Sequence, residues 1–524
     1  MGDDDEESLF SFFEQDEYIE YRHFRLSADG STIEFSYTYC GAPPTLSTLH
    51  LPPDFWARGS DESGSRCECG STGAAAAACR QQQCALAMFS IGMVVLVWHW
   101  MPRPTRAVRV RAAALSAPQA AFWRAFYNAV LREYFALNGL PEDFTIEVEV
   151  VVDGSSVGAL PPAPAPVCNA CRRRGPRVLV PLGGGKDSRE VAAENFLICR
   201  VKPLVRLEHE FNYTTLHARR GIGIRMEGHP WAALCAFDAA LAAAALGYDC
   251  VAAGNERSAN HGNGMLWQGQ EAAHTSQHHT SKCQRGTCIA RTRRSHISIP
   301  KNSRRTRLTL SVRHCGAAQE VNHQYDKSFA FEAAANAYIA RHIARGVHYF
   351  SALQPLWEVQ IAREFARHPQ YLPVFISCNE GRLQRWCGAC DKCLFVFCIL
   401  AAWVDCDELS RCFGRNLLED LSLLPQLRAL MGIEGYKPLE CVGEPHEVML
   451  SLWLALKRHH DRHGASAPPP RLLQEVQPLL PAGARDQLDS VLRDFSNDHL
   501  VPDWLLPSVQ RVASRPASPH AAPR

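Results

Sequence analysis

Short apolar segments alternate with helical segments between residues 178 and 401, and this alternation is what most constrains the fold. The apolar runs with the length of buried strands are residues 178–180, 251–253, 349–353 and 371–376. Helices are expected at residues 231–246, from Leu356 and from Asp391. Parallel strands need crossover connections, which helices usually supply. The expected fold class is therefore α/β, with a parallel, Rossmann-like sheet in this part of the chain.

The residues before this region suggest a separate N-terminal domain. Apolar and polar residues alternate strictly over residues 33–39, as in a half-buried strand, and another strand is expected at residues 146–152. Apolar residues recur at steps of three and four over residues 118–137, which predicts an amphipathic helix. The proline-rich residues 161–166 form a stiff spacer. We therefore expect an α+β domain at residues 1–160.

Two further features of the chain concern its core and its end. The low-complexity residues 64–83 are interpreted as a loop insertion, and the 15-residue apolar run after them, residues 84–98, as buried core, since a membrane span needs roughly 20 residues. Residues from Ser466 onward are rich in Pro, Ala and Arg. The expected organisation is an α/β domain over residues 161–405 and a helical region over residues 406–524 with a frayed end.

Charge and cysteine content restrict the partners and the compartment. The 524 residues carry 55 Lys+Arg and 54 Asp+Glu, so no overall field attracts nucleic acid or an anionic membrane, and neither is an expected partner. The odd number of cysteines, 21, in a long chain indicates a reducing compartment. The acidic start lacks the pattern of an import signal. These features predict a cytoplasmic protein.

One strongly basic stretch does not fit the folded pattern. Residues 272–319 hold ten Lys or Arg and no Asp or Glu. A chain of like charges with few apolar residues cannot bury a core, so we expect a mobile, disordered insertion over about residues 264–319. A basic arm for nucleic acid and a retained intron in the gene model are the alternatives.

A glycine-rich segment follows the expected strand at residues 178–180. Glycines allow backbone N–H groups to approach an anion closely, and the start of a following helix favours negative charge. A lysine adds charge, a serine adds a hydroxyl, and Asp187 is suited to hold Mg²⁺. The spacing differs from a Walker loop. The residues predicted to bind ATP are Gly183, Gly184, Gly185, Lys186, Asp187 and Ser188. An ordinary strand-to-helix turn is the alternative.

Four cysteines are spaced as zinc ligands are. They are Cys378, Cys387, Cys390 and Cys393. Four thiolates suit tetrahedral zinc and leave no position open for water, so the zinc would be structural. Disulfides are one alternative. Another is that three of these cysteines merely begin a buried helix.

Polar residues follow the expected strand at residues 251–253. The segment is residues 254–260, and open α/β sheets bind ligands at the carboxyl ends of their strands. Three further polar segments join it, at residues 321–328, 353–358 and 436–443. A solvated turn is the alternative interpretation of residues 254–260.

Two resemblances follow from these motifs. The glycine segment resembles the pyrophosphate loop of N-type ATP pyrophosphatases, Ser-Gly-Gly-x-Asp-Ser, with Gly183 in place of the first serine. Most of the chain resembles the ATP-dependent UDP-N-acetyl-α-D-muramoyl-L-alanyl-L-glutamate epimerases of peptidoglycan precursor synthesis. The segments that carry this likeness are residues 183–188, 255–260, 321–325, 386–393 and 437–443. His261, where that family's pattern suggests an acidic residue, and the basic stretch are departures.

The resemblance implies a reaction and its residues. ATP would adenylate the terminal carboxylate of the UDP-muramoyl dipeptide, a base would remove the α-proton, and the product would be D-glutamate, with AMP and pyrophosphate released. The candidate bases, which the sequence does not rank, are Glu256, His323, Glu358 and Glu440. The residues expected to bind the substrate are Asn255, Arg257, Asn260 and Lys437.

Two other functions are compatible with the sequence. The cysteine spacing is similar to that of nucleobase-nitrile synthases in the pyrophosphatase superfamily, which would imply a deazapurine carboxylate as substrate. A zinc-stabilised binding protein that has lost turnover is the non-enzymatic alternative.

Overall fold

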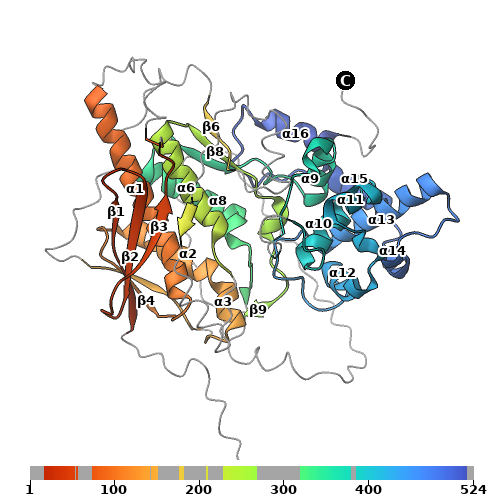
Figure 1. The fold of residues 1–524 in the computed structure, drawn as a ribbon, viewed down its shortest axis with the longest axis horizontal. Coiled ribbons are helices and arrows are strands. Elements are labelled where there is room, and N and C mark those ends of the chain that lie inside the picture. The colour runs from red at the N-terminus through yellow and green to blue at the C-terminus, as the bar shows by residue number, and fades with distance from the viewer. Residues whose placement is uncertain are drawn as a thin grey trace, which may run out of the picture.

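The computed structural model describes most of the chain, and every structural statement below concerns this part. The described residues are 17–53, 55–56, 73–141, 143–151, 176–181, 208–210, 228–267, 319–378, 380 and 385–515. Figure 1 shows an N-terminal part built of sheets and helices, and a C-terminal part built of helices. The fold is a mixture of α and β that contains a parallel sheet.

A six-stranded mixed sheet forms one side of the N-terminal part. Its strands, in spatial order, are β5 (Glu147–Val150), β4 (Ala107–Val110), β1 (Tyr18–Leu26), β2 (Thr32–Tyr39), β3 (Thr45–His50) and β7 (Glu208–Glu210). The alternation expected at residues 33–39 is confirmed, because Ile33, Phe35 and Tyr37 are fully buried. The strands expected at residues 33–39 and 146–152 are thus β2 and β5. The edge strand β7 comes from well beyond residue 160.

Two apolar helices lie side by side against this sheet. Helix α1 (Gly73–Trp100) packs on β1 and β2, and α6 (Trp231–Leu246) packs on α1. Helix α6 is buried on all sides from Ala239 to Leu246, as expected for a segment that is apolar all round, while Trp231 and Cys235 near its start are exposed. The expected loop at residues 64–83 is wrong from Gly73 onward, because the alanine run there has high helix propensity and forms the first turns of α1.

The apolar run at residues 84–98 is confirmed as core. By length and composition, Ala78–Trp100 of α1 could cross a membrane, but 83% of its most apolar window is buried inside the protein. The residues that bury it include those of β1, β2 and α6, so the length of α1 is explained by packing.

A three-stranded parallel sheet lies beyond α6, as the alternation of strands and helices predicts. Its order is β11 (His348–Ser351), β8 (Cys250–Ala253) and β6 (Val178–Leu179). Successive side chains point to opposite faces. Val251 and Tyr349 face the core with α6 and α8 (Phe329–Tyr338), whereas Ala252 and Phe350 face the core with α9 (Glu358–Phe365) and α16 (Leu506–Ser514). Helices therefore cover both faces of this sheet.

Helix α10 (Asp391–Ala401) is the centre of the C-terminal part, and nearly all of its residues are buried. The helices around it are α11 (Cys406–Phe413), α12 (Leu424–Leu430), α13 (Pro445–His463), α14 (Arg471–Val476) and α15 (Ala484–Arg493).

The expected amphipathic helix at residues 118–137 is present as α2 (Ala117–Val130) and α3 (Arg132–Leu137). Strands β9 (Leu266–Trp267) and β10 (Gln319–Glu320) pair with each other in a short antiparallel sheet.

The strand expected at residues 371–376 is wrong. These residues form turns after a short 3₁₀ turn at Pro369–Tyr371. Pro373 has no N–H to donate to a sheet, which disfavours a central strand. Phe375 is nevertheless buried, packed against Phe365 and Trp386, which accounts for its apolar character.

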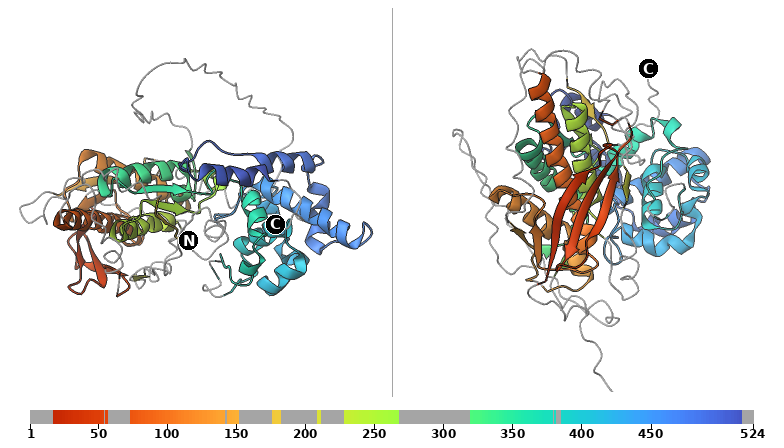
Figure 2. Two further views of the ribbon diagram at one scale, coloured as in Figure 1. Left: turned by 90° about the horizontal axis from the view of Figure 1, so that it is seen from above. Right: turned by 60° about the vertical axis from the view of Figure 1, so that its left-hand side comes forward.

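The buried hydrophobic residues form three cores. The first runs from Ile19 to Tyr349, the second from Trp357 to Leu492, and the third lies between the parallel sheet and helices α9 and α16. The first core extends across residue 160 and the second across residue 405, while the third joins residues before 349–357 to residues after them. Figure 2 shows the N-terminal strands and the C-terminal helices at opposite ends of the molecule.

The crossing of α1 over the first sheet predicts a stability effect at Gly92. A Cβ atom there would lie 2.0 Å from Tyr21 Oη and 2.9 Å from Phe35 Cδ1, both on buried rings. Gly92→Ala should therefore lower the free energy of unfolding, with an overpacking cost of about 1–3 kcal/mol or more outweighing the roughly 1 kcal/mol gain in helix propensity. Chemical denaturation measures it.

The matched control is the same substitution at Gly483. A Cβ atom there would meet only the end of the Gln487 side chain, at 3.8 Å. Gly483→Ala should leave the denaturation midpoint close to that of the wild type. A Gly92→Ala variant as stable as this control would contradict the packing described for α1.

Candidate functional site

The polar turn after β8 lies at the carboxyl edge of the parallel sheet, where α/β proteins bind ligands. The Asn255 N–H donates to Ser351 Oγ at 3.1 Å, and the Arg257 N–H donates to the Leu356 carbonyl at 3.0 Å. These bonds join the loop that follows β8 to the loop that follows β11. The segments predicted at residues 254–260 and 353–358 are therefore neighbours. Glu256, which lies between Asn255 and Arg257 in the sequence, is buried, with 3% of its surface exposed.

Two of the residues expected to bind substrate take part in the framework of this edge. Arg257 donates to Asp494 Oδ2 at 2.8 Å and lies over the ring of Trp357, whose Nε1 donates to the same oxygen. Asn260 uses both ends of its carboxamide, donating to the Arg257 carbonyl and accepting from the Phe329 N–H. Arg257 thus ties the sheet edge to the residue after α15, and Asn260 fixes the turn. Their roles toward substrate stay predictions.

His261, at a position where the resemblance led us to expect an acidic residue, lies beside the same aromatic residue. Its ring lies 5.7 Å from the ring of Trp357, and the ring of His446 lies 5.0 Å from it on another side. Burial lowers the pKa of His446, and His261 and Arg257 lower it further while Glu444 opposes them. Trp357 is thus in contact with two histidine rings and the Arg257 guanidinium.

His323 joins the N-terminal and C-terminal parts. Its Nε2 donates to the Glu440 carbonyl at 2.8 Å, which leaves Nδ1 as a buried acceptor with no partner among the described residues. Burial lowers the pKa of His323 to about 4, and the positive charges of Lys437, Lys327 and Lys392 lower it as well. The imidazole is therefore neutral at physiological pH. This contact brings the predicted segments at residues 321–328 and 436–443 together.

Three lysines act on His323, of which Lys392 and Lys437 are buried and Lys327 is half-buried. Lys437, expected as a substrate ligand, donates to Glu444 at 2.7 Å, and Lys392 donates to the Cys441 carbonyl. The Cys441 thiol and the Glu256 and Asp326 carboxylates hold the pKa of Lys327 well above its usual value and outweigh its desolvation. Lys327 and Lys392 were missed as site residues, although each lies inside a segment that carries the resemblance.

A pair of buried carboxyl groups lies under the loop at residues 436–443. Glu358, a candidate base, is 1% exposed, and Glu447 is fully buried. Burial, with Glu358 as the next cause, raises the pKa of Glu447 to about 8. Glu447 accepts from the N–H groups of Val359 and Glu444. Gly443 is needed here, because a Cβ atom would lie 2.8 Å from Glu447 Oε2 and 3.2 Å from Glu358 Cγ.

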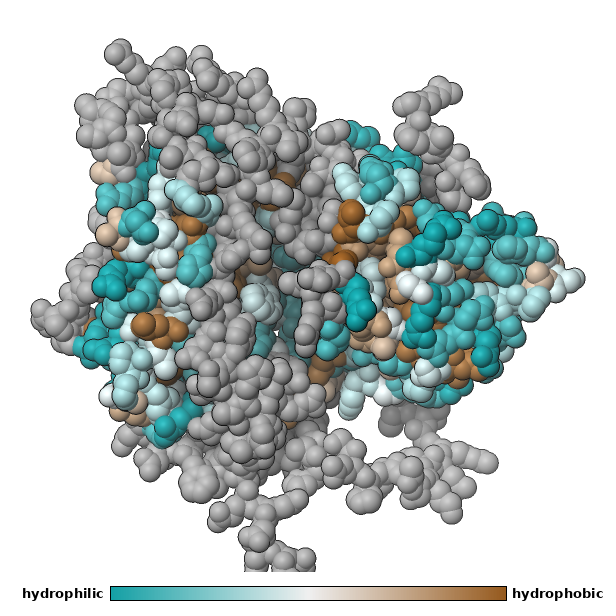
Figure 3. All heavy atoms as spheres, in the orientation of Figure 1, coloured by the Kyte–Doolittle hydropathy of each residue, from teal (hydrophilic) through white to brown (hydrophobic). Residues whose placement is uncertain are grey.

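Several buried polar atoms at this edge have no hydrogen-bond partner among the described residues. They are the Ser258 hydroxyl, His323 Nδ1 and both carboxamide atoms of Gln324 and Gln354. Unpaired buried polar groups are rare in folded proteins, and a bound ligand is one way to satisfy them. Figure 3 shows the visible described surface of the C-terminal part as largely hydrophilic, with smaller apolar patches. The edge therefore has the chemistry of a ligand site.

The predicted ATP loop, residues 183–188, lies outside the described residues, as do most of the basic stretch and the end of the tail. The strand before the loop is described. Strand β6 runs parallel to β8, with Val178 opposite Cys250 and Leu179 opposite Val251. The carboxyl end of β6 therefore lies at the same edge as the polar turn after β8.

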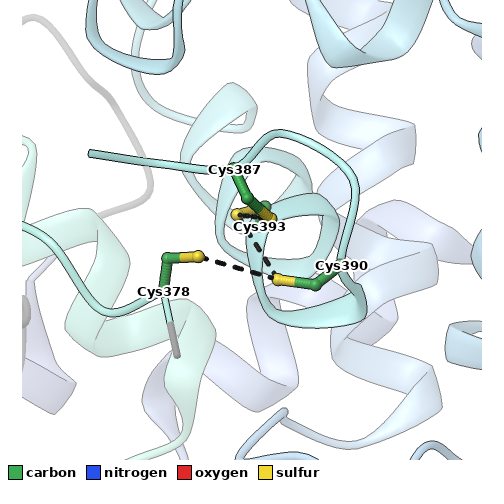
Figure 4. A group of neighbouring side chains, drawn as sticks. All are labelled: Cys378, Cys387, Cys390 and Cys393. Atoms are coloured by element: carbon green, nitrogen blue, oxygen red, sulfur yellow. Dashed lines mark hydrogen bonds between the residues drawn. The ribbon is translucent and has the colours of Figure 1, made fainter. Parts of the chain in front are cut away.

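The four predicted zinc ligands are brought together by the structure (Figure 4). Their Sγ atoms all lie within 4.8 Å of one another, with 3.5 Å between Cys390 and Cys393 and 3.9 Å between Cys378 and Cys390. Zinc–sulfur bonds of about 2.3 Å in a tetrahedron place the sulfurs roughly 3.8 Å apart. No disulfide joins these four cysteines. The residues present therefore fit a zinc ion.

The thiols of this cluster affect one another's ionisation. The hydrogen bond between Cys390 and Cys393 lowers the pKa of Cys390 to about 5 and raises the pKa of Cys393. Cys390 also caps the start of α10, and Gly388 takes a positive φ of 70° in the turn between the ligands. The interpretation that the cysteines merely begin a buried helix is therefore incomplete, because Cys378 approaches from another segment.

The low pKa of His323 predicts a pH dependence of stability. The folded-state pKa, about 4, is below the ordinary value of 6.5, so the unfolded chain binds the proton first as pH falls. Above pH 6.5 His323 therefore has no effect on the pH dependence of stability. Below pH 6.5 the free energy of unfolding should fall by about 1.4 kcal/mol per pH unit as the pH drops toward 4. In His323→Asn the slope of the free energy of unfolding against pH should be smaller by the contribution of about one bound proton.

The measurement is the free energy of unfolding at several pH values for both proteins. His99, whose pKa burial also lowers to about 4, remains in the variant and keeps part of the slope. An unchanged slope in His323→Asn would show that His323 is protonated in the folded protein.

Comparison with known proteins places the chain in a family. The model of the MurL N-terminal domain matches residues 34–283 and 311–352, and that of the MurL C-terminal domain matches residues 374–481. The residues left between the two N-terminal matches, 284–310, all lie in the basic stretch. No solved structure is significantly similar.

Curated relatives carry a single name, UDP-N-acetyl-alpha-D-muramoyl-L-alanyl-L-glutamate epimerase. The protein from Xanthomonas oryzae pv. oryzae is 37% identical over 193 residues, 36% of this chain and 42% of the relative. That from Salinispora tropica is 41% identical over 140 residues, 26% of this chain and 31% of the relative. That from a Micromonospora strain is 37% identical over 164 residues, 30% of this chain and 36% of the relative.

The aligned stretch spans less than half the length of each of these relatives. The N-terminal domain model alone, however, covers more than half of this chain, and the C-terminal model covers the four clustered cysteines and the loop that contacts His323. The chain therefore belongs to the MurL family.

Proposed function

We propose that this chain inverts the α-carbon of the terminal L-glutamate of UDP-N-acetylmuramoyl-L-alanyl-L-glutamate. The observation that carries the proposal is the contact between His323 and Glu440, since it joins a segment matched by the MurL N-terminal domain to one matched by the MurL C-terminal domain. Buried polar atoms without partners gather at the same edge. The curated relatives that the chain matches are named as epimerases of this dipeptide.

ATP activates the carboxylate in this proposal. The α-proton of a free carboxylate is hard to remove, because abstraction puts a second negative charge beside the first. Transfer of AMP to the carboxylate cancels the first charge and makes the α C–H more acidic. Residues 183–188 would hold the pyrophosphate, with Mg²⁺ on Asp187, in an ATP-pyrophosphatase-like domain. The position of β6 supports this assignment, because its carboxyl end lies at the edge where the polar segments meet.

The buried charges of the site suit an anionic substrate. Lys327, Lys392 and Lys437 lie around a neutral His323, so the edge combines positive charge with a hydrogen-bond acceptor. The dipeptide brings two carboxylates, and its diphosphate adds further negative charge. Positive side chains in a partly desolvated site bind such groups more strongly than they would in water.

Zinc is proposed as a structural ion. Cys378, Cys387, Cys390 and Cys393 would hold it and connect residue 378 to the start of α10. Four protein ligands leave no open position for water, so the ion would stabilise the fold and take no part in the reaction.

The direct test is incubation with ATP, Mg²⁺ and the UDP-muramoyl dipeptide, followed by acid hydrolysis and chiral analysis of glutamate. D-glutamate should appear together with AMP, and in deuterium oxide the product should carry deuterium at the α-carbon. AMP release driven equally well by a deazapurine carboxylate would favour the nitrile-synthase alternative. Binding of the dipeptide without AMP or inversion would favour the non-catalytic one.

The role of the glycine loop is tested by Asp187→Asn. Without the carboxylate that holds Mg²⁺, AMP formation should fall by at least about 100-fold, because metal-assisted charge stabilisation is worth several kcal/mol. The control is Asp503→Asn, since Asp503 is exposed just before α16. Undiminished AMP formation in Asp187→Asn would exclude this residue from the ATP site.

The zinc assignment is tested by metal analysis and by Cys390→Ser. About one zinc per chain is expected, and Cys390→Ser should lower both the zinc content and the thermal midpoint. Cys412→Ser is the matched control, because Cys412 is half-buried on α11 and lies outside the four-cysteine cluster. A metal-free wild type as stable as the purified protein would contradict the assignment.

A further inference from the structure

The chain that leaves α15 runs beside the start of α9. Gln360, which is fully buried, donates from Nε2 to the Leu492 carbonyl at 3.1 Å and to the Asp494 carbonyl at 3.0 Å. The Ser496 N–H donates to the Pro355 carbonyl at 3.1 Å. Helices α9 and α15 are in contact (Figure 1). The backbone at Asp494 is therefore fixed beside the start of α9.

The Asp494 carboxylate joins two side chains of the polar edge. Its Oδ2 atom accepts from Arg257 Nη1 at 2.8 Å and from Trp357 Nε1 at 3.1 Å. The guanidinium carbon of Arg257 lies over the Trp357 ring, 4.3 Å from its centre. One carboxylate oxygen and one aromatic ring thus hold the guanidinium. A long side chain held in this way has lost much of its conformational entropy before any ligand binds.

Most hydrogen-bond donors of Arg257 are unused. A guanidinium carries five N–H groups in a fixed planar fork. Among the residues that the structure describes, Asp494 is the only acceptor for this guanidinium. The Arg257 side chain is 22% exposed, so a ligand can reach it while much of it is shielded from water. Such a fork binds a carboxylate or a phosphate through two parallel hydrogen bonds, so its free N–H groups are suited to an oxyanion.

A purely structural ion pair is the other interpretation of the contact between Arg257 and Asp494. The Asp494 side chain is 44% exposed, and ion pairs exposed to this degree contribute little to stability. The buried carboxamide of Gln360 already joins the end of α15 to α9. Because the ion pair is not needed to hold these helices together, a role in orienting the guanidinium is favoured.

The Arg257 guanidinium lies close to the C-terminal side of the edge. The ring of His446 lies 5.0 Å from the ring of Trp357, which the guanidinium covers. Burial lowers the pKa of His446, and Arg257 is among the charged groups that lower it further. His446 is in the first turn of α13, directly after the loop at residues 436–443. Arg257 is therefore placed where the N-terminal and C-terminal parts meet.

Asp494 lies outside the residues that the two family models match. The C-terminal match ends at residue 481, whereas Arg257 lies within the N-terminal match. The contact between them thus adds a side chain to the polar edge that the family comparison does not include.

We propose that Arg257 binds an oxyanion of the dipeptide substrate, and that Asp494 is the positioning residue that holds the guanidinium for it. The inference rests on the proposed function and deepens it. The oxyanion is the side-chain carboxylate of the glutamate or the diphosphate of the UDP group, since two parallel N–H donors suit both. The α-carboxylate of the glutamate is left for adenylation.

The first test measures binding and does not depend on turnover. The full chain is titrated with the UDP-muramoyl dipeptide in a calorimeter, with Mg²⁺ and α,β-methylene-ATP, which cannot be cleaved to AMP. Arg257→Gln should raise Kd at least about 10-fold, the size expected for charge-assisted hydrogen bonds. An Arg257→Gln variant that binds the dipeptide as tightly as the wild type would overturn the proposal.

The same titration tests the positioning residue. Asp494→Ala should raise Kd about 5- to 10-fold, because the long Arg257 side chain must then be ordered when the substrate binds. Asp494→Asn keeps an acceptor oxygen and should stay within about 3-fold of the wild type. The control is Asp503→Ala, an exposed acidic residue before α16, which should not change Kd. Equal Kd values for Asp494→Ala and this control would overturn the role of Asp494.

A double-mutant cycle separates positioning from an independent or structural effect. If Asp494 acts through Arg257, adding Asp494→Ala to Arg257→Gln should raise Kd by less than about 2-fold. A further increase of about 5-fold or more in that background would overturn the positioning role. Thermal midpoints of all variants check that they are folded, as expected from the Gln360 contacts that each of them keeps.

Two altered ligands identify the oxyanion. The first has glutamine in place of glutamate, so that a neutral carboxamide replaces the side-chain carboxylate, and the second lacks the UDP group. The ratio of Kd for Arg257→Gln to Kd for the wild type should fall to about 1 with the glutamine ligand if Arg257 binds the carboxylate. It should fall to about 1 with the UDP-free ligand if Arg257 binds the diphosphate. A ratio of at least about 10 with both ligands would overturn the proposal.

The failure of this inference is distinguishable from the failure of the proposed function. A wild type that neither binds the dipeptide nor forms AMP and D-glutamate would remove the proposed function itself. A wild type that inverts the dipeptide, together with an Arg257→Gln variant that binds it equally tightly, would remove only the roles given to Arg257 and Asp494.

Discussion

The burial of polar side chains between the N-terminal and C-terminal parts is the constraint on which the rest of the structure depends. Charged and polar groups lose their hydration there, and such groups are tolerated only when partners replace the water. His323 with the Glu440 carbonyl, Lys392 with the Cys441 carbonyl, and Lys437 with Glu444 supply those partners across chain segments far apart in sequence. These contacts fix which segments meet at the carboxyl edge of the parallel sheet.

The hydrophobic packing explains why this edge is at the junction. Helices α6 and α8 cover one face of the parallel sheet, and α9 and α16 cover the other, so neither face is open to a ligand. The carboxyl ends of the strands are the part of the sheet that these helices leave for a ligand. The hydrogen bond from Arg257 to Asp494 joins the C-terminal helices to this edge. A site formed there draws residues from both domains of the family. This arrangement accounts for the spread of the sequence motifs over nearly two hundred residues.

Much of the fold follows from periodicity in the sequence, and the exceptions have physical causes. The alternation at residues 33–39 and the alanine-rich stretch at residues 231–246 each correspond to a described element. In the sequence the alanines after Gly73 have the pattern of a low-complexity loop, yet alanine favours helix, and α1 begins there. Phe375 made residues 371–376 resemble a strand, although its burial arises from contacts with other aromatic residues.

The candidate site could be outlined from sequence, but its pairings could not. The motifs identified the segments that meet, and the cysteine spacing identified four thiols whose sulfur atoms do converge. No sequence pattern indicates that His323 contacts the Glu440 carbonyl, or that Glu447 lies beside Glu358, because these contacts depend on how distant segments cross. The roles of Asn260 and Arg257 in the framework are likewise visible only in three dimensions.

The central claim is that the dipeptide binds at the edge where these segments meet. Hydrogen exchange of the full chain, measured by mass spectrometry with and without the UDP-muramoyl dipeptide, tests it most directly. The account predicts slower exchange at residues 255–261, 320–328 and 436–443, with α15 unchanged. Slower exchange confined to other parts of the chain, with these three segments unaffected, would contradict it.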